Sequence, residues 1–137
     1  MPAPSFAPPD NELTLPFWEG VAAGELRLPR CAACGTWMWY PEPDVPHCVG
    51  APVEWVALSP VGSIFTFTVV RRPFLPGATR ADVPFTSIFV ELDEAPGVRL
   101  VGLLREGVEP HVGMRVTAQF PERDGRRTIE FEPLAQQ

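Results

Sequence analysis

The chain has 137 residues, of which 45% are hydrophobic, so it is long enough for one domain of ordinary size or two very small ones. Its net charge is −6, which argues against nucleic acid as a partner because such binding depends on neutralising phosphates. All 11 of its cations are arginine. No run approaches the roughly 20 apolar residues that span a bilayer, and the N-terminus lacks the basic-then-apolar pattern of a secretory signal. We therefore expect a cytoplasmic protein with no membrane partner.

The N-terminal part of the chain is expected to hold a flexible arm followed by one short helix. Residues 1–13 are rich in proline and show no run of apolar residues, which predicts the arm. A helix is predicted within residues 10–24, because Thr14 can cap it and Pro16 suits an early helical position. Gly24 suits its C-terminal end.

A damaged metal-site pattern follows the helix. Cys31 and Cys34 form a CxxCG knuckle, and Cys48 comes fourteen residues after Cys34, in a segment that would be a second knuckle if Val45 were cysteine. Two complete knuckles place four thiolates around Zn²⁺ at about 2.3 Å. The pattern predicts that the three sulfurs converge in a degenerate zinc ribbon and leaves zinc occupancy open. His47 is a substitute fourth ligand, but neighbouring ligands rarely fit the geometry of a knuckle.

The strands of this ribbon are predicted from alternation. Leu26 and Leu28 alternate with charged residues, which indicates a strand leading into the first knuckle. We expect residues 36–40 to be its partner strand. Together with the helix, these elements would form a unit over residues 14–52.

From residue 53 to residue 137 the pattern is that of a small β-barrel. Short apolar or alternating runs are separated by glycine and proline, and joining them into a closed barrel would remove the sheet edges. The predicted strands cover residues 55–58, 63–71, 85–92, 98–104, 115–120 and 128–131.

One cluster in the predicted barrel suits an anionic ligand. Arg71 and Arg72 leave the clearest strand and enter a long loop over residues 73–84, which also contains Phe74 and Arg80. Arginine binds phosphate through two parallel hydrogen bonds, and a phenylalanine ring offers an apolar surface. The cluster predicts a site for an anion with an organic tail, and solvated arginines at a strand end are the alternative.

Catalytic machinery of the chain's own is not predicted. His47 and His111 are its two histidines, no GxSxG motif is present, and the three cysteines are taken by the ribbon. We therefore expect no catalytic residue and no activity of the chain alone.

Several segments, in this order and spacing, resemble the acyl-CoA-associated zinc-ribbon/OB-fold family, long known as a domain of unknown function. The likeness covers about residues 14–134. The segments that carry it are FWEG at 17–20, GELRL at 24–28, CAACG at 31–35, PHC at 46–48, GSIFTFTVV at 62–70, RP at 72–73, VELDE at 90–94 and VGMRV at 112–116.

The resemblance implies a short helix, a rubredoxin-like zinc ribbon and a five-stranded OB-fold barrel. Members are accessory subunits of thiolase-superfamily enzymes, among them the aldolases that shorten steroid side chains, and help to hold the CoA thioester or stabilise the partner. It implies a non-catalytic subunit of a heteromeric acyl-CoA complex, with Arg71, Arg72, Phe74 and Arg80 as candidate CoA contacts. Two alternatives stay open: a partner of a hot-dog-fold enoyl-CoA hydratase, or a nucleic-acid-binding module.

Overall fold

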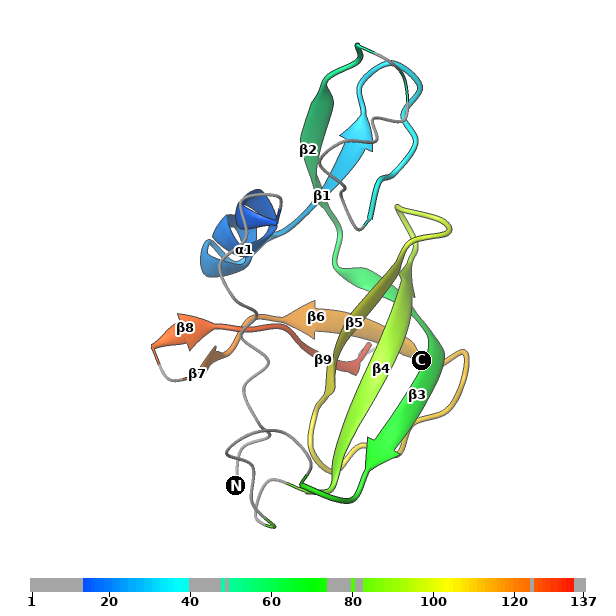
Figure 1. Cartoon of the computed structure of the whole chain (residues 1–137). Helices are drawn as coiled ribbons and strands as arrows, with labels where there is room; N and C mark the ends of the chain where they lie inside the picture. Colours follow the sequence, from blue (N-terminus) through cyan, green and yellow to red (C-terminus); the bar gives the residue numbers. More distant parts are fainter. Residues whose placement is uncertain are drawn as a thin grey trace.

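A two-stranded ribbon projects from a closed five-stranded barrel, and one short helix lies beside the base of the ribbon (Figure 1). The computed structural model describes residues 14–39, 48, 50–73, 80, 83–123 and 125–134. In chain order the elements are α1 (Leu15–Ala22), β1 (Leu26–Cys31), β2 (Val53–Leu58), β3 (Val61–Val70), β4 (Phe85–Leu92), β5 (Arg99–Leu104), β6 (Arg115–Gln119), β7 (Glu122–Arg123), β8 (Arg126–Arg127) and β9 (Glu130–Pro133). The fold is mainly β with one short helix, as the sequence predicts.

The helix α1 forms where the sequence predicts it. Pro16 lies in its first turn, where the missing N–H removes no helical hydrogen bond, and Gly24 follows its end with a φ of 79°. Phe17 and Val21, one turn apart, bury the same side of the helix. The helix is held mainly by this buried face, because eight residues are too few for a helix to be stable alone.

The ribbon pairs its strands differently from the prediction. β1 pairs with β2 along its whole length in antiparallel register, from Leu26 opposite Leu58 to Cys31 opposite Val53. The segment over residues 36–40 that was predicted as its partner does pair with β1 in its described part, but only through one antiparallel bridge between Arg30 and Trp37 with two backbone hydrogen bonds. The longer pairing, with β2, was not predicted. β2 pairs over a longer stretch because it has six consecutive extended residues, whereas the segment after Cys34 begins with a turn at Gly35.

The barrel closes in the order β3, β4, β5, β9, β6 and back to β3. Its neighbouring strands are antiparallel except β5 and β9, which run parallel, with Leu103 opposite Glu130. The register between β3 and β4 shifts at Phe65, a bulge that bends the long strand β3 around the barrel. These five strands agree with the predicted OB-fold, while β2, which was predicted as part of the same β run, belongs to the ribbon sheet.

One hydrophobic core joins all three parts of the molecule. Inward-facing residues of every barrel strand fill the interior, and the buried faces of α1 and β1 belong to the same cluster. The largest fully buried side chains are Phe17, Leu26 and Leu28 from the helix and ribbon, and Ile64, Ile88, Leu92, Leu100 and Phe131 from the barrel. Full burial of such a side chain contributes about 1.5–3 kcal/mol. The base of the ribbon is therefore packed as firmly as the barrel.

A small hairpin that the sequence analysis missed lies between β6 and β9. Its strands β7 and β8 are two residues each and are joined through Gly125, which has a φ of 79°. The hairpin lies on the α1 side of the barrel in Figure 1. Within the residues that the structure describes, no helix is long and apolar enough to cross a membrane.

Candidate functional site

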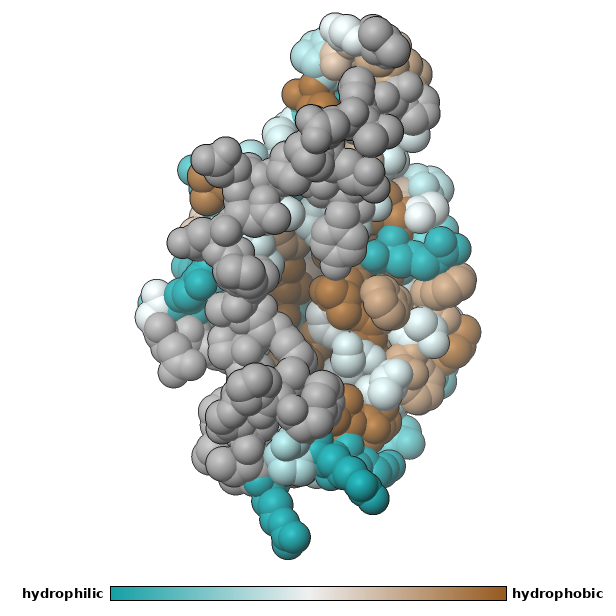
Figure 2. All heavy atoms as spheres, in the orientation of Figure 1, coloured by the Kyte–Doolittle hydropathy of each residue, from teal (hydrophilic) through white to brown (hydrophobic). Residues whose placement is uncertain are grey.

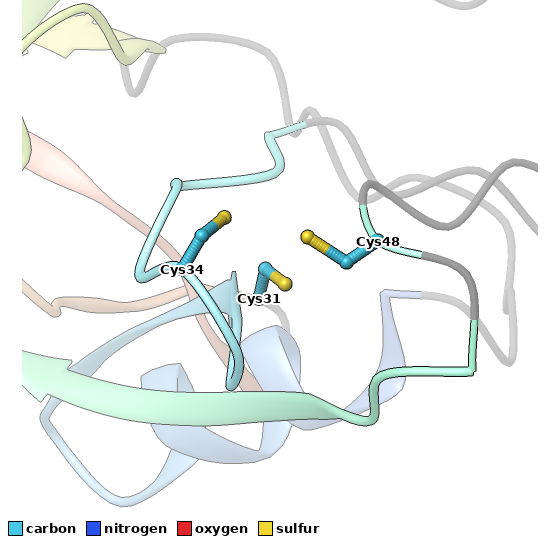
Figure 3. Close-up of side chains that lie close together, drawn as sticks. All are labelled: Cys31, Cys34 and Cys48. Carbon is cyan, nitrogen blue, oxygen red and sulfur yellow. The ribbon is translucent and has the colours of Figure 1, made fainter.

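The three cysteines meet at the far end of the ribbon from the barrel. The Sγ atoms of Cys31, Cys34 and Cys48 lie within 4.8 Å of one another. Figure 3 shows the sulfurs pointing into a common space, with Cys31 and Cys34 on one knuckle and Cys48 on the opposite segment. The predicted convergence of the three cysteines is thus present in the structure.

The backbone around the first knuckle explains why Cys31 and Cys34 face the same point. The Gly35 N–H donates to the carbonyl of Cys31 over 2.7 Å, which closes the turn, and Gly35 takes a φ of 77° that suits glycine. The Cys31 N–H donates to the carbonyl of Thr36 over 2.8 Å. The turn therefore fixes both thiols from one short segment.

Two further hydrogen bonds hold the rest of the ribbon end. The Ala32 N–H donates to the carbonyl of Pro52 over 3.0 Å, and the Ala51 N–H donates to the carbonyl of Cys48 over 3.0 Å. The first of these bonds ties the knuckle to the segment that enters β2. The second stabilises the turn from which Cys48 projects.

The local electrostatics favour a thiolate at Cys34. The hydroxyl of Thr36, 3.2 Å from the Cys34 sulfur, together with a backbone hydrogen bond from Thr36, lowers the pKa of Cys34 to about 6. Hydrogen bonds between the Cys48 thiol and the sulfurs of Cys31 and Cys34 raise the pKa of Cys48 to about 11, because they favour its protonated form, and repulsion between neighbouring thiolates adds to the effect. Without a cation in their midst, the three thiols therefore resist ionising together.

The donor set fits a thiophilic cation. Three soft sulfur ligands suit zinc, and the three sulfurs, all within 4.8 Å of one another, are near enough together to bind a single ion. Among the described residues, no fourth histidine, cysteine or carboxylate joins the group. Val45 and His47, the residues that the sequence raised for the fourth position, lie outside the described residues.

The predicted ligand cluster of the long loop is only partly described. Arg71 and Arg72 are exposed just beyond the end of β3, and Arg80 is exposed further along the loop. Phe74 lies outside the described residues. No contact that joins these arginines is found in the described part of the chain, so the anion site stays a prediction.

An exposed apolar face on the barrel was not predicted. Phe65, Phe89 and Val101 come from the neighbouring strands β3, β4 and β5, and each keeps roughly two fifths of its surface exposed. The Arg99 guanidinium lies 3.9 Å from the centre of the Phe65 ring, a cation–π contact. Figure 2 shows hydrophobic residues interspersed with polar ones on the side of the barrel that faces the viewer. We call these four residues the outer barrel face.

The sequence held only an ambiguous signal for this face. Both sides of β3 carry apolar or β-branched residues, so alternation alone did not say which side points outward. Aromatic rings and arginine are enriched where proteins contact one another, and contiguous apolar surface often marks such sites. The outer barrel face is therefore suited to a protein contact.

Two family models match the chain one after the other. The model described as the ChsH2 rubredoxin-like zinc ribbon domain matches residues 18–54, and that of the ChsH2 C-terminal OB-fold domain matches residues 55–121. The chain also resembles a solved chain of the "Ltp2-ChsH2(DUF35) aldolase" with a TM-score of 0.77 and 28% identity, over 92% of this chain and 98% of that chain.

Two curated relatives are considerably longer proteins. The 3-oxo-4,17-pregnadiene-20-carboxyl-CoA hydratase alpha subunit of Mycobacterium tuberculosis is 38% identical over 92% of this chain and 39% of its own length. A probable enoyl-CoA hydratase alpha subunit of Thermomonospora curvata is 30% identical over 88% of this chain and 38% of its own length. The chain thus spans about two fifths of the length of the curated relatives it matches.

Proposed function

The chain belongs to the ChsH2 family of zinc-ribbon and OB-fold proteins, and on this basis we propose that it is a non-catalytic subunit of a complex that processes acyl-CoA thioesters. The observation that carries the proposal is the likeness of this chain to a chain of the Ltp2-ChsH2 aldolase over nearly the whole length of both. The name of that aldolase combines two proteins, Ltp2 and ChsH2. Both curated relatives are named as alpha subunits, which also supports a role for this chain as a subunit of an assembly.

We assign the partner enzyme to the thiolase superfamily and its reaction to aldol cleavage. The support is the family that the sequence resembles, whose members accompany such aldolases, together with the aldolase named above. The mycobacterial relative is named for a steroid-derived CoA thioester, so steroid acyl-CoA thioesters are the first substrates to test.

The structure suggests how such a subunit would contact its partner. The outer barrel face combines two phenylalanines, a valine and an arginine on three adjacent strands, away from the sulfur cluster. Aromatic and arginine side chains carry much of the binding energy at protein interfaces. We assign this face to the contact with the partner enzyme.

The arginines of the long loop would serve the CoA moiety. Arg71, Arg72 and Arg80 are exposed cations in a chain of net charge −6, and the phosphates of CoA need such donors. Phe74 would offer the adenine or the acyl chain an apolar surface. This role would make the subunit part of the substrate site without making it catalytic.

A second candidate is a subunit of an enoyl-CoA hydratase. It is favoured by the names of the two curated relatives, both of which are hydratase alpha subunits. The chain would then assist hydration of an unsaturated acyl-CoA, and its partner would be a hot-dog-fold hydratase.

Purification of the tagged chain from its native source, with identification of the stoichiometric partner, tests the proposal. We expect a thiolase-superfamily protein, aldol cleavage by the complex and no turnover by the chain alone. A hydratase as the partner would favour the second candidate. Turnover of acyl-CoA by the purified chain alone, at a rate typical of enzymes, would contradict both.

Two arginine variants separate the roles of the loop and the interface. In the complex, Arg72→Ala and Arg80→Ala should each raise the KM for acyl-CoA about tenfold if the arginine makes a charge-assisted contact, while gel filtration shows intact assembly. Arg126→Ala is the matched control, because Arg126 is an exposed arginine on the β7–β8 hairpin. Loss of assembly with an unchanged KM would instead assign the loop to the interface.

A further inference from the structure

We propose that the free edge of the ribbon, strand β2, joins two copies of this chain by pairing antiparallel with its own counterpart across a two-fold axis. The two ribbons would then form one continuous sheet in the order β1, β2, β2 and β1. This contact is separate from the outer barrel face, and it does not depend on which enzyme the chain accompanies.

The hydrogen bonds of the ribbon show which backbone groups of β2 point away from β1. The Ala32 N–H donates to the carbonyl of Pro52, just beyond the facing residues Cys31 and Val53. In an antiparallel ladder this bond makes Cys31 and Val53 a pair that exchanges no hydrogen bonds with each other. Every second residue of β2, beginning at Val53, therefore directs its N–H and C=O groups away from β1.

The outward-facing residues are Val53, Trp55 and Ala57. In the part of the chain that the structure describes, their backbone groups have no hydrogen-bond partner on the side away from β1. The free edge ends at Ser59, whose N–H donates to the Glu94 carboxylate over 2.9 Å. Figure 1 accordingly shows β2 at the margin of the ribbon, with β1 on one side and no other described strand on the opposite side.

The edge lacks the features that usually keep sheet edges from pairing. Natural edges are commonly protected by lysine, by proline or by a bulge. β2 reads VEWVAL and pairs with β1 in unbroken register, and its one charged residue, Glu54, is already paired with Arg30. Val53 is 44% exposed at one end of the strand, and Ala57 is exposed near the other. An extended strand can therefore reach the free groups.

The order of residues along the edge suits a second copy of the same strand. With the two-fold axis at Trp55, the free groups of Val53 meet those of Ala57 in the second copy, and the two Trp55 residues face each other. Each of these pairs exchanges two hydrogen bonds, so all the outward-facing groups are used. Glu54 then stands opposite Val56, so no like charges are directly opposed. A contact of this kind closes on itself and stops at the dimer.

Sedimentation and hydrogen exchange of the full chain test the proposal. The purified protein is kept reduced with a phosphine, so that no disulfide joins two copies. Analytical ultracentrifugation between about 1 µM and about 1 mM should show a reversible monomer–dimer equilibrium. The amides of Val53, Trp55 and Ala57 should exchange more slowly as the dimer forms. The amide of Val56, which faces β1, should change much less.

Variants of the edge locate the contact. Ala57→Pro removes one outward N–H without removing a bond to β1, and it should weaken the dimer at least about tenfold. Ala57→Ser keeps the N–H and is the matched control, which should dimerise like the wild type. Val53→Lys leaves the backbone unchanged and adds a charge typical of protected edges, so it should also weaken the dimer. Circular dichroism checks that each variant is folded.

Three results would overturn the proposal. The first is a chain that stays monomeric at about 1 mM. The second is a dimer that neither Ala57→Pro nor Val53→Lys weakens, which would place the contact elsewhere. The third is slowed exchange at the edge only after the partner enzyme is added, which would assign the edge to that enzyme. None of these results bears on the identity of the partner enzyme, which the co-purification decides.

Discussion

Gly102 leaves no room for a side chain between β5 and the centre of the barrel. A Cβ atom at this position would stand 2.6 Å from the Cε2 atom of Phe131, which is fully buried. Packed interiors cannot absorb such an overlap without shifting a ring or a strand. Glycine at 102 and phenylalanine at 131 are therefore a complementary pair.

A double-mutant cycle checks this pair. Gly102→Ala should lower the free energy of unfolding by about 1–3 kcal/mol, because the Phe131 ring must move. In the Phe131→Leu background the same change should cost less, with a coupling of about 0.5–3 kcal/mol. Urea unfolding of the four proteins measures the coupling, and Thr68→Ala, an exposed change on β3, serves as control. Additive effects would mean that the two residues do not interfere.

At the scale of single residues, the sequence predicted the sulfur cluster but not the outer barrel face. The cysteine cluster follows from local spacing, since the CxxCG turn directs two sulfurs to one point whatever surrounds it. The exposure of Phe65 depends on a bulge and on which side of β3 faces the core, and both are decided by distant strands. Because both sides of β3 carry apolar or β-branched residues, the sequence alone did not predict which side of the strand faces solvent.

Among the elements, the ends of three barrel strands are tied by one arginine. Arg115 at the start of β6 donates through two nitrogens to Asp93 just beyond β4, and also to Ser63 on β3 over 2.9 Å. This ion pair lowers the pKa of Asp93. Both side chains keep about two fifths of their surface exposed, so solvent limits the stabilisation to about 1 kcal/mol or less.

This tie predicts a small loss of stability in acid. Because the pKa of Asp93 is lower in the folded protein than in the unfolded chain, the pair stabilises fully above the unfolded value and is lost as the pH falls through the folded value. Asp93→Asn should therefore cost up to about 1 kcal/mol at pH 7 and almost nothing near pH 2. Urea unfolding of both proteins at the two pH values measures the difference. An equal cost at both would show that the hydrogen bonds, not the charge, stabilise this corner.

Strand positions were more predictable than strand partners. The alternation in β3 to β6 is local, and these strands lie where the sequence predicted them, within a few residues at the ends. The predicted partner of β1, the segment after Cys34, makes only one bridge to it, and the longer pairing with Val53–Leu58 was missed because those residues lie further along the chain. The β7–β8 hairpin was missed because two-residue strands carry no periodic signal.

For the whole molecule, the shared core predicts a single cooperative unfolding transition. All four tryptophans, Trp18, Trp37, Trp39 and Trp55, lie in the helix and ribbon, whereas most of the strand residues lie in the barrel. Tryptophan fluorescence and far-UV circular dichroism thus report different parts of the molecule. We expect coincident transitions in urea, because α1 and β1 pack into the barrel core. An earlier fluorescence transition would mean that the ribbon and helix unfold alone.

The contact between α1 and the β7–β8 hairpin brings together segments from opposite ends of the described chain. α1 contacts β8, and just beyond the helix the Nη1 atom of Arg127 lies 3.2 Å from where a Cβ on Gly24 would stand, so positions about a hundred residues apart meet here. During synthesis, the surroundings of the helix are therefore complete only after residue 127 has left the ribosome. Contacts this distant in sequence slow folding, typically to milliseconds or seconds. Until then only the side of the helix that meets β1 and Trp39, with Phe17, can be covered by neighbouring parts of the chain.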